Sequence, residues 1–429
     1  MKKITKKIII FILKAEARFA LWRWKPKIVA VTGSVGKTST KDAIFSVFSK
    51  LSTAQKSEKS FNSEIGVPLA ILGLENPWNN IGKWFIALIS GLVAAVFERK
   101  PAEWMVLEIG ADRPRDIEML TKWIKPDIGV LNMIGKMPVH VEFFDTPEDV
   151  AKEKEFLVKA IKPKGMLVYY ADDEVVANIA AVSKKKSISF GFSDRADVTA
   201  SNYTILYENE KLSGLSVKIN YEGKSFPLKQ SGTLGRQQIY AAMASVAAAM
   251  AAGFNVVSVL GALREHHGPP GRMRLIAGIK GSTIIDDTYN SSPAALAEAL
   301  ATLGEVNVAG RRVAVLGDMR ELGKHSDDEH KSIGRLSSTI CDLLVTVGES
   351  GRKIAEGAMQ NGMDESKIFQ YENSVDAGKD IQNMILQNDV VLVKGSQGVR
   401  MEKIVEEIMM EPDKAPDLLV RQESEWKKR

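Results

Sequence analysis

Residues 32–38 (Thr-Gly-Ser-Val-Gly-Lys-Thr) have the composition and spacing of a loop that binds the phosphates of ATP. The two glycines of this loop carry no Cβ, so the backbone can approach phosphate oxygens closely. Lys37 can reach the β- and γ-phosphates, and the Thr38 hydroxyl can hold Mg²⁺. The general pattern has a further glycine where this chain has Val31, so the shorter Gly-x-x-Gly-Lys-Thr form is the one present. We therefore predict that the protein uses ATP and Mg²⁺.

A phosphate loop needs a strand before it and a helix after it, because a helix N-terminus points N–H groups and a positive dipole end at the phosphates. Pro26 is followed by an apolar run at 27–31, which predicts a buried parallel strand. From about Lys37 a helical pattern begins, with one apolar face. Further short apolar strands alternate with helical patterns, which predicts a parallel sheet covered by helices on both faces. These strands are expected at 104–109, 127–131 and 166–170.

The second half of the chain begins with a different pattern. Between 197 and 230 polar and apolar residues alternate around two turn signals, which predicts a small antiparallel sheet. An alanine-rich helix is expected at 236–252, and the Pro-Pro-Gly sequence at 269–271 marks a domain boundary. Beyond it, strands and helices alternate again, which predicts a Rossmann-like doubly wound domain. Its strands are expected at 283–287, 312–316, 343–347 and 390–393.

These patterns predict an α/β protein in three parts. The first is a basic and apolar helix at 1–25. The second, at 26–268, is a P-loop parallel-sheet ATPase domain with the small antiparallel sheet appended to it. The third, at 269–429, is the Rossmann-like C-terminal domain. With 45% apolar and 26% charged residues, the composition is that of a globular protein and excludes wholesale disorder.

Charge and cysteine content narrow the class of protein further. A net charge of +5 over 429 residues suits anionic substrates such as nucleotides, but it gives no reason to expect nucleic-acid binding. Cys341 is the only cysteine, so neither an intramolecular disulfide nor a thiolate zinc site can form, and a reducing compartment is expected. Its apolar neighbours favour a buried structural thiol. We expect a cytoplasmic protein that acts as a monomer.

Two apolar segments raise the question of contact with a membrane. The helix at 1–25 joins lysines to an apolar run at 8–13, but no small-residue cleavage site follows, so a signal peptide is not expected. The segment 84–97 is apolar but shorter than the ~20 residues that cross a bilayer. Both segments could rest on the inner face of a membrane. We favour packing of both against the protein itself, because exposed apolar patches are uncommon without a purpose.

Several motifs, in their order along the chain, resemble those of the Mur ligases, which join amino acids or dipeptides to a nucleotide-linked muramoyl chain. The motifs of the second half are most similar to the branch of the family that adds D-alanyl-D-alanine. The matching segments are 32–39, 62–68 (Asn-Ser-Glu-Ile-Gly-Val-Pro), 108–111 (Glu-Ile-Gly-Ala), 132–135 (Asn-Met-Ile-Gly), 140–142 (His-Val-Glu), 270–273 (Pro-Gly-Arg-Met), 285–293 (Ile-Asp-Asp-Thr-Tyr-Asn-Ser-Ser-Pro), 316–323 (Leu-Gly-Asp-Met-Arg-Glu-Leu-Gly) and 393–396 (Val-Lys-Gly-Ser).

The resemblance implies an ATP-dependent ligase of peptidoglycan synthesis. ATP would phosphorylate a substrate carboxylate, and an incoming amine would displace the phosphate to form an amide. The implied substrates are a UDP-N-acetylmuramoyl tripeptide and D-alanyl-D-alanine. Because two anions must meet, metal ions and cations are needed between them. The implied Mg²⁺ ligands are Thr38, Glu108 and His140, and the implied catalytic residues are Lys37, Glu108, His140 and Lys154.

Lys154 stands where many Mur ligases carry a lysine carbamate that bridges the metals. The family run continues Lys-Gly-Glu, whereas this chain continues Lys-Glu-Phe, so Lys152 is an alternative for the same role. Without the resemblance, the Lys/Glu cluster at 151–155 would be interpreted as a solvated helix face.

The resemblance also implies contacts with the nucleotide and the substrates. The family segment that reaches adenine appears here at 235–238 with Gln237 in place of histidine, which leaves the adenine contact open. The implied ATP contacts are Gly33, Ser34, Val35, Gly36, Lys37, Thr38, Ser39, Gln238, Arg272, Asp287, Tyr289 and Asn290. The implied substrate contacts are Asn62, Asp318, Lys394 and Ser396; for the last three, helix caps and loop hydrogen bonds are the alternative.

One departure leaves the acceptor substrate open. The phosphate loop begins at Gly33, whereas a typical muramoyl-tripeptide ligase carries a UDP-binding domain before it, and only the helix at 1–25 precedes it here. Three hypotheses remain. The chain is a ligase for D-alanyl-D-alanine, a Mur-type ligase for another carboxylate such as a polyglutamate- or cyanophycin-like polymer, or a membrane-associated nucleotide-binding protein without ligase activity.

Overall fold

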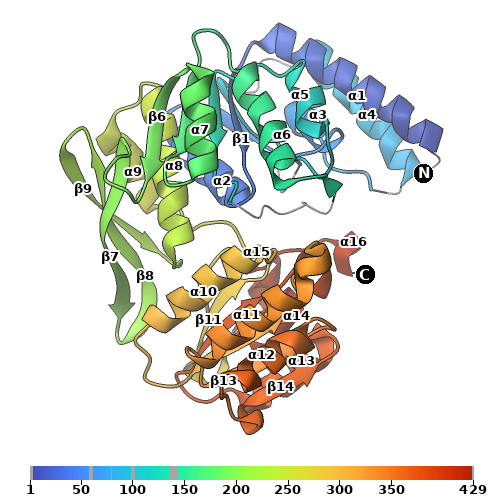
Figure 1. The fold of residues 1–429 in the computed structure, drawn as a ribbon. Coiled ribbons are helices and arrows are strands. Elements are labelled where there is room, and N and C mark those ends of the chain that lie inside the picture. The colour runs from blue at the N-terminus through green and yellow to red at the C-terminus, as the bar shows by residue number, and fades with distance from the viewer. Residues whose placement is uncertain (1–2, 58–60, 79, 98–101, 136–142, 428–429) are drawn as a thin grey trace. The chain divides into compact units, whose positions relative to one another are not determined.

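The computed structural model describes residues 3–57, 61–78, 80–97, 102–135 and 143–427, and the predicted His140 lies outside them. The chain forms two compact units, each with its own core (Figure 1). Unit 1 comprises 1–201, 218–226 and 240–266, and unit 2 comprises 202–217, 227–239 and 267–429. The predicted domain boundaries stay predictions.

Unit 1 is built on the predicted parallel sheet. β1 (Lys27–Thr32) lies between β3 (Trp104–Glu108) and β4 (Ile128–Leu131), and both pairings are parallel. Five of the six β1 residues are buried, which explains why the strand is a continuous apolar run. The sheet continues with β2 (Ala54–Lys56) on one side and with β5 (Met166–Tyr170) and β6 (Lys186–Gly191) on the other.

Helices cover this sheet. Phe48 of α2 packs edge-on against Trp104 and Phe254, with ring centroids 4.9 and 5.1 Å apart, so α2 is fixed on the face of β3. The core beside α1 and α3 contains Leu13, Val67 and Met105. The helices are α1 (Lys3–Trp24), α2 (Lys37–Leu51), α3 (Gly66–Leu72), α4 (Ile81–Phe97), α5 (Asp116–Thr121), α6 (Pro147–Ala160), α7 (Glu174–Ser183), α8 (Arg236–Ala251) and α9 (Val256–Arg264).

Three longer strands follow β6, and they differ from the prediction in one respect. They are β7 (Val198–Glu208), β8 (Lys211–Tyr221) and β9 (Lys224–Ser231). The predicted turns connect them, but the strands extend the main sheet instead of forming a separate one, in the order β2-β3-β1-β4-β5-β6-β7-β8-β9. Phe190 and Gly191 of β6 pair with Val198 and Thr199 of β7. This pairing satisfies the hydrogen-bonding edge that β6 would otherwise expose.

Unit 2 is the predicted doubly wound domain. Its six-stranded sheet has the order β10-β11-β15-β12-β13-β14, and only β10 is antiparallel to its neighbour. Apolar clusters lie on the two faces of the sheet. The strands are β10 (Arg274–Ala277), β11 (Thr283–Asp287), β12 (Arg312–Gly317), β13 (Leu343–Val347), β14 (Ile368–Tyr371) and β15 (Val390–Lys394). The two strands that the sequence did not predict, β10 and β14, are the edge strands, which are short and partly exposed.

The helices of unit 2 connect these strands, and the last two of them belong to the C-terminal tail. Leu419 is buried in the core of the unit, so part of the tail docks on it. The helices are α10 (Pro293–Glu305), α11 (Ser326–Ser338), α12 (Gly351–Gln360), α13 (Ser374–Met384), α14 (Glu402–Ile408), α15 (Ala415–Leu418) and α16 (Ser424–Lys427). Single 3-10 turns lie at Ile279–Gly281, Gly323–His325, Glu365–Lys367, Gln397–Val399 and Pro412–Lys414.

Within the described part of the chain, no helix has both the length and the apolar content that are needed to cross a membrane.

Candidate active site

The phosphate loop joins β1 to α2, and its two glycines are required by space as well as by conformation. Gly33 has φ +145°, and a Cβ on it would lie 2.6 Å from the Cβ of Asn132. Gly36 caps α2 with φ 77°, and a Cβ there would lie 3.2 Å from a ring carbon of Tyr240. A side chain at either position would therefore strain the loop or push its neighbours away.

The segment that follows β4 holds the loop in place. The backbone N–H groups of Ser34 and Val35 donate to the Met133 carbonyl at 2.8 and 3.2 Å. The Met133 N–H in turn donates to the Tyr240 hydroxyl at 2.7 Å, and burial raises the pKa of Tyr240 well above its usual value. The N–H groups of Ser34 and Val35 are therefore already hydrogen-bonded within the protein. The N–H groups in the first turn of a helix have no acceptor inside the helix, so those of α2 are the donors that can bind an anion.

Lys37 lies at the start of α2, with its ammonium folded back over the loop. Its Nζ donates to the Gly33 carbonyl at 2.9 Å and to the Ser34 carbonyl at 3.4 Å. These contacts hold a positive charge beside the helix N-terminus. The loop therefore combines a cation, a helix dipole and backbone donors, the set that a polyphosphate requires.

Glu108 ends β3 next to the loop, because Val31 and Glu108 are partners in the β1–β3 register. Its side chain is buried, and its Oε2 accepts from the Thr38 hydroxyl at 3.0 Å. Its Oε1 accepts from the amide of Asn62 at 3.1 Å. Lys41 lies 3.9 Å from Oε2, which offsets the cost of a buried carboxylate.

The oxygens of Thr38 and Glu108 fit the ligands that Mg²⁺ prefers. Among the described residues, no group of three His, Cys, Asp or Glu side chains could enclose a metal. This is compatible with Mg²⁺, which keeps several waters and binds through one or two protein oxygens together with substrate phosphates. The third predicted ligand, His140, lies outside the described residues, so its role stays a prediction.

Lys154 points into unit 1 from α6, and its exposed fraction is only 2%. Burial lowers its pKa to about 7, and the positive charge of Lys37 acts in the same direction. The alternative residue, Lys152, is exposed and pairs with Asp149 at 2.8 Å. Glu153 accepts N–H donors from the start of α5, the shortest at 2.7 Å, and so fixes the position of α6. The geometry favours Lys154 over Lys152 as the reactive amine.

A second cluster lies in unit 2, where β11 and β15 end side by side. Asp287 and Lys394 are register partners, and their charged atoms lie 2.7 Å apart. Burial is the largest influence on the pKa of each group, raising that of Asp287 and lowering that of Lys394, and their pairing opposes both shifts. Lys394 also donates to the Asn290 carbonyl at 2.8 Å. The guanidinium of Arg272 lies over the Tyr289 ring, 4.1 Å from its centroid.

The remaining predicted residues of unit 2 have structural contacts. Gln238 is buried and donates to the Arg272 carbonyl at 2.7 Å, so it braces the backbone that carries Arg272. Asp318 accepts from the Gly351 N–H at 2.7 Å and caps α12. Ser396 accepts from the Arg320 N–H at 2.9 Å. For Asp318 and Ser396 this geometry matches the alternative of helix caps and loop hydrogen bonds.

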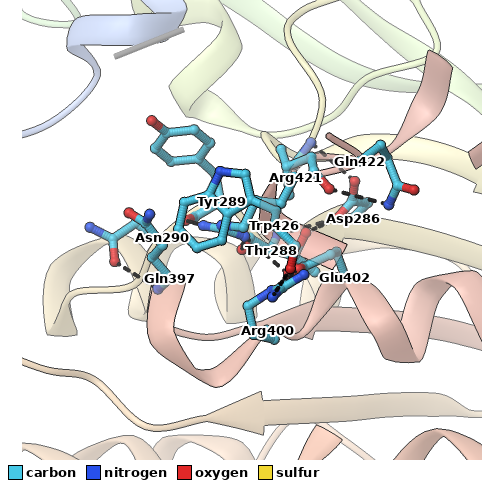
Figure 2. A network of polar contacts seen from close by, with 12 residues as sticks. Asp286, Thr288, Tyr289, Asn290, Gln397, Arg400, Glu402, Arg421, Gln422 and Trp426 are labelled. Carbon is cyan, nitrogen blue, oxygen red and sulfur yellow. Dashed lines mark hydrogen bonds and ion pairs between the residues drawn. The ribbon is translucent and has the colours of Figure 1, made fainter. Parts of the chain in front are cut away.

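The C-terminal tail supports the segment that carries Tyr289, a role that the sequence did not indicate. Figure 2 shows Arg421 reaching from the tail to Glu402, at 3.0 Å, and to the Thr288 carbonyl, at 3.1 Å. Arg421 also donates to the Tyr289 carbonyl, and Arg400 pairs with Glu402 from the other side (Figure 2). Asp286 supports the same segment through the Thr288 hydroxyl, at 2.6 Å. No local motif could have identified this role of Arg421, because Glu402, Thr288 and Tyr289 lie 19 or more positions away from it.

Lys41 is a further residue near the site that the sequence did not indicate. It is fully buried, and its Nζ donates to the Ser57 carbonyl at 2.8 Å. A weak signal was present, because Lys41 follows Thr38 by three positions and therefore shares its side of α2.

Comparisons with known proteins agree with these observations. The family description "Mur ligase middle domain" matches residues 31–249, and "Mur ligase, glutamate ligase domain" matches residues 271–397. The UDP-N-acetylmuramoyl-tripeptide--D-alanyl-D-alanine ligase of Bacillus subtilis is 27% identical, over 93% of this chain and 79% of its own length. This similarity covers both units.

Solved structures lead to the same family. MurF ligase from Thermotoga maritima, in complex with ADP, is 26% identical with a TM-score of 0.77, over 95% of this chain and 84% of that one. MurF from Acinetobacter baumannii is 25% identical with a TM-score of 0.75, over 92% and 79%. The α/β fold predicted from the sequence is confirmed, and the family predicted from its motifs is confirmed as well: the chain belongs to the Mur ligase family.

Proposed function

We propose that this protein is an ATP-dependent, ADP-forming ligase that joins D-alanyl-D-alanine to the terminal carboxylate of a UDP-N-acetylmuramoyl tripeptide. The phosphate loop with the buried Thr38–Glu108 pair beside it is the observation that carries the proposal, since it supplies both a polyphosphate site and metal ligands. The similarity to ligases with this named reaction over about nine-tenths of the chain supports the substrates. Nucleotide substrates favour a cytoplasmic location, and the chain is expected to act as a monomer.

The reaction proceeds in two steps. The substrate carboxylate attacks the γ-phosphorus of ATP, which gives an acyl phosphate and releases ADP. The amine of the dipeptide then attacks the acyl carbon, and the tetrahedral intermediate expels inorganic phosphate and loses a proton to form the amide. In the first step two anions approach each other, so positioned cations and N–H donors lower the barrier.

In unit 1, Lys37 and the first turn of α2 bind the β- and γ-phosphates in this proposal. Thr38, Glu108 and His140 hold Mg²⁺, which would offset the repulsion between the triphosphate and the carboxylate. Asn62 keeps Glu108 oriented through its amide, at 3.1 Å, and stays a candidate for contact with the substrate. Gly33, Gly36, Ser34, Val35 and Ser39 shape the loop.

Lys154 is the residue that we assign to carbamate formation. Its pKa of about 7 means that a large fraction of the amine is neutral at physiological pH. The ammonium first loses a proton, and the neutral amine then adds to CO₂ and loses a second proton. A buried cation is thereby replaced by an anionic carbamate. That anion is suited to a site that gathers metal ions and the Lys37 charge.

In unit 2, Arg272 binds the γ-phosphate and Asp287 binds the ribose hydroxyls in this proposal. The Nε of Arg272 is buried and has no hydrogen-bond partner among the described residues, which favours a bound anion. Tyr289 and Asn290 flank the nucleotide, and Gln238 stays a candidate for the adenine contact. Asp318, Lys394 and Ser396 stay candidates for contact with the peptide substrates.

The proposal is tested by measuring phosphate release from the purified protein with ATP, Mg²⁺, UDP-muramoyl tripeptide and D-alanyl-D-alanine, omitting each in turn. Release is expected only when all four are present, together with a product whose mass corresponds to the pentapeptide. Equal release without the dipeptide or without the nucleotide peptide would contradict the assigned substrates. Phosphate release that requires glutamate and a different carboxylate substrate, in place of the dipeptide and the UDP-muramoyl tripeptide, would favour a ligase for another acceptor.

A further inference from the structure

The outward faces of α1 and α4 form an apolar surface that the ligase reaction does not use. Among the described residues, four of the exposed large apolar side chains lie on α1 and eight on α4, against nine on the rest of the chain. The two helices pack against each other (Figure 1). The α1–α4 surface consists of Ile8, Phe11, Phe19, Trp22, Ile81, Phe85, Ile86, Ile89, Leu92, Val93, Val96 and Phe97.

The distribution of residues on α4 is the reverse of that on an ordinary surface helix, because most of its large apolar side chains face outward. Its buried positions carry Trp84 and four small residues, Ala87, Gly91, Ala94 and Ala95. Its exposed positions carry the larger aliphatic and aromatic side chains, with exposed fractions of 67% for Phe85 and 76% for Phe97. A helix that faces water normally has polar residues there, so this face is suited to an apolar surrounding.

The exposed stripe of α1 has the same character and adds basic residues. Phe11 and Trp22 are 74% and 68% exposed and repeat at helical spacing. Lys7, Lys14 and Arg18 are separated by seven and four positions, so they line one edge of this stripe. The only acidic residue of the helix is Glu16, and it is buried.

We propose that the α1–α4 surface rests on an anionic lipid bilayer, with the apolar side chains of both helices in the interfacial layer and the basic edge of α1 at the headgroups. Charge complementarity selects this occupant: the exposed charges of α1 are positive and α4 contributes only Lys83. Helices with one apolar and one basic face lie in this way in a membrane interface, and Trp22 has the amphipathic ring typical of that layer. The inference does not depend on the ligase reaction.

The test is co-sedimentation of the full-length protein with vesicles of phosphatidylcholine alone or with about one-third phosphatidylglycerol. We expect binding to the anionic vesicles that weakens as salt is raised, because screening shortens the range of the attraction from about 10 Å at 0.1 M to about 3 Å at 1 M. Protein that stays in the supernatant with anionic vesicles at low salt would overturn the proposal.

Two triple variants separate the charged and apolar contributions. Lys7→Glu/Lys14→Glu/Arg18→Glu should weaken binding about 100-fold or more, at about fivefold for each basic residue lost. Phe11→Ser/Phe85→Ser/Phe97→Ser should weaken it by about tenfold for each ring removed from the interface. Matched controls change exposed residues elsewhere, Lys164→Glu/Lys211→Glu/Lys229→Glu and Val182→Ser/Val257→Ser/Leu386→Ser, and should bind as the wild type does. Variants that bind as tightly as their controls would contradict the assigned surface.

Two further measurements distinguish a bilayer from other occupants. Trp22 fluorescence, assigned by its loss in Trp22→Phe, should shift to the blue when anionic vesicles are added. Analytical ultracentrifugation without lipid should give a monomer. A dimer that the phenylalanine variant converts to monomer would mean that a second copy covers this surface, and would overturn the lipid assignment. Circular dichroism melting curves of the variants confirm that they are folded.

Discussion

The two units place their candidate site residues in different ways. In unit 1 a contiguous loop of seven residues carries most of the site, and its shape comes from two glycines, a strand end and a helix N-terminus. In unit 2 the cluster is assembled from segments far apart in the sequence, such as Asp287 with Lys394 and Tyr289 with Arg421. The first site depends on backbone geometry, and the second on buried charged side chains that hold one another.

This difference predicts two kinds of mutational response. Changing a functional side chain of the phosphate loop in unit 1 should remove chemistry and leave the fold intact, because the backbone still shapes the loop. Changing a charged side chain in unit 2 should leave its partner buried and unpaired, which destabilises the unit itself. Four variants test this contrast and the assignment of the buried amine in unit 1.

The largest effect is expected for Lys37→Ala. Removing the cation beside the transferred phosphoryl group should lower the rate of phosphate release by about 10³-fold. The midpoint of thermal unfolding should change little, because Lys37 is half-buried and its hydrogen bonds to the Gly33 and Ser34 carbonyls are made within the loop. Lys164→Ala, at an exposed position, is the matched control. A Lys37→Ala protein that kept full turnover would remove the loop from the active site.

Arg421→Ala tests the opposite behaviour in unit 2. It leaves Glu402 with one guanidinium instead of two and frees the carbonyls of Thr288 and Tyr289, so the free energy of unfolding should fall by about 3 kcal/mol. Denaturant unfolding measures this change. Lys414→Ala, which breaks only the exposed pair with Glu411, is the control and should cost less than about 1 kcal/mol.

Arg421→Ala should also change the steady-state kinetics of the ligase reaction. Since Arg421 holds the segment that carries Tyr289, the KM for ATP should rise in Arg421→Ala more than kcat falls. Unchanged stability together with unchanged KM would show that the tail does not position this segment.

Lys154→Met tests the buried amine of unit 1 through pH. The pKa of Lys154 in the folded protein, about 7, lies below its value of about 10.4 in an unfolded chain, so the unfolded state binds more protons between these values. The stability of the wild type should therefore rise with pH in this window by up to about 1.4 kcal/mol per pH unit relative to Lys154→Met. Equal pH slopes for the two proteins would mean that Lys154 is solvated.

The smallest effect is expected for Lys152→Ala. Lys152 is exposed and forms a surface pair with Asp149, so its removal should change stability by about 0.5 kcal/mol or less. Turnover and its dependence on dissolved CO₂ should match the wild type, whereas Lys154→Met should lose both. If Lys152→Ala were the variant that lost CO₂ dependence, the assignment of the two lysines would have to be exchanged.

Much of the fold could be predicted because its signals are local. The strands β5, β11 and β13 have the predicted bounds, since each contains a short run of buried apolar residues. The edge strands β10 and β14 were missed because they are short and partly exposed, and therefore lack that run. The hairpin strands were found, but their attachment to β6 depends on the parallel pairing of β6 with β7, which the alternating pattern of the hairpin does not specify.

The candidate site residues also fall into those that local motifs identify and those whose contacts depend on the folded structure. The loop residues and Glu108 could be identified from motifs, and the structure brings Thr38 and Glu108 within 3.0 Å. The contacts of Asp318 and Gln238 could not be identified from motifs. The same kind of side chain can cap a helix, brace a loop or bind a ligand, and its neighbours in the folded protein decide which of these it does. Packing of 1–25 and 84–97 against the protein was favoured, and each helix does bury one face, while the opposite face is exposed.

The sequence by itself determined the family, the phosphate loop and the alternation of strands and helices, because glycine conformations and apolar periodicity act over a few residues. Only the tertiary structure decided that Lys154 is buried while Lys152 is exposed, that Arg421 supports the Tyr289 segment, and that α4 faces its small residues inward. These properties depend on which distant surfaces meet. Burial and long-range charge pairing arise only when the chain has packed.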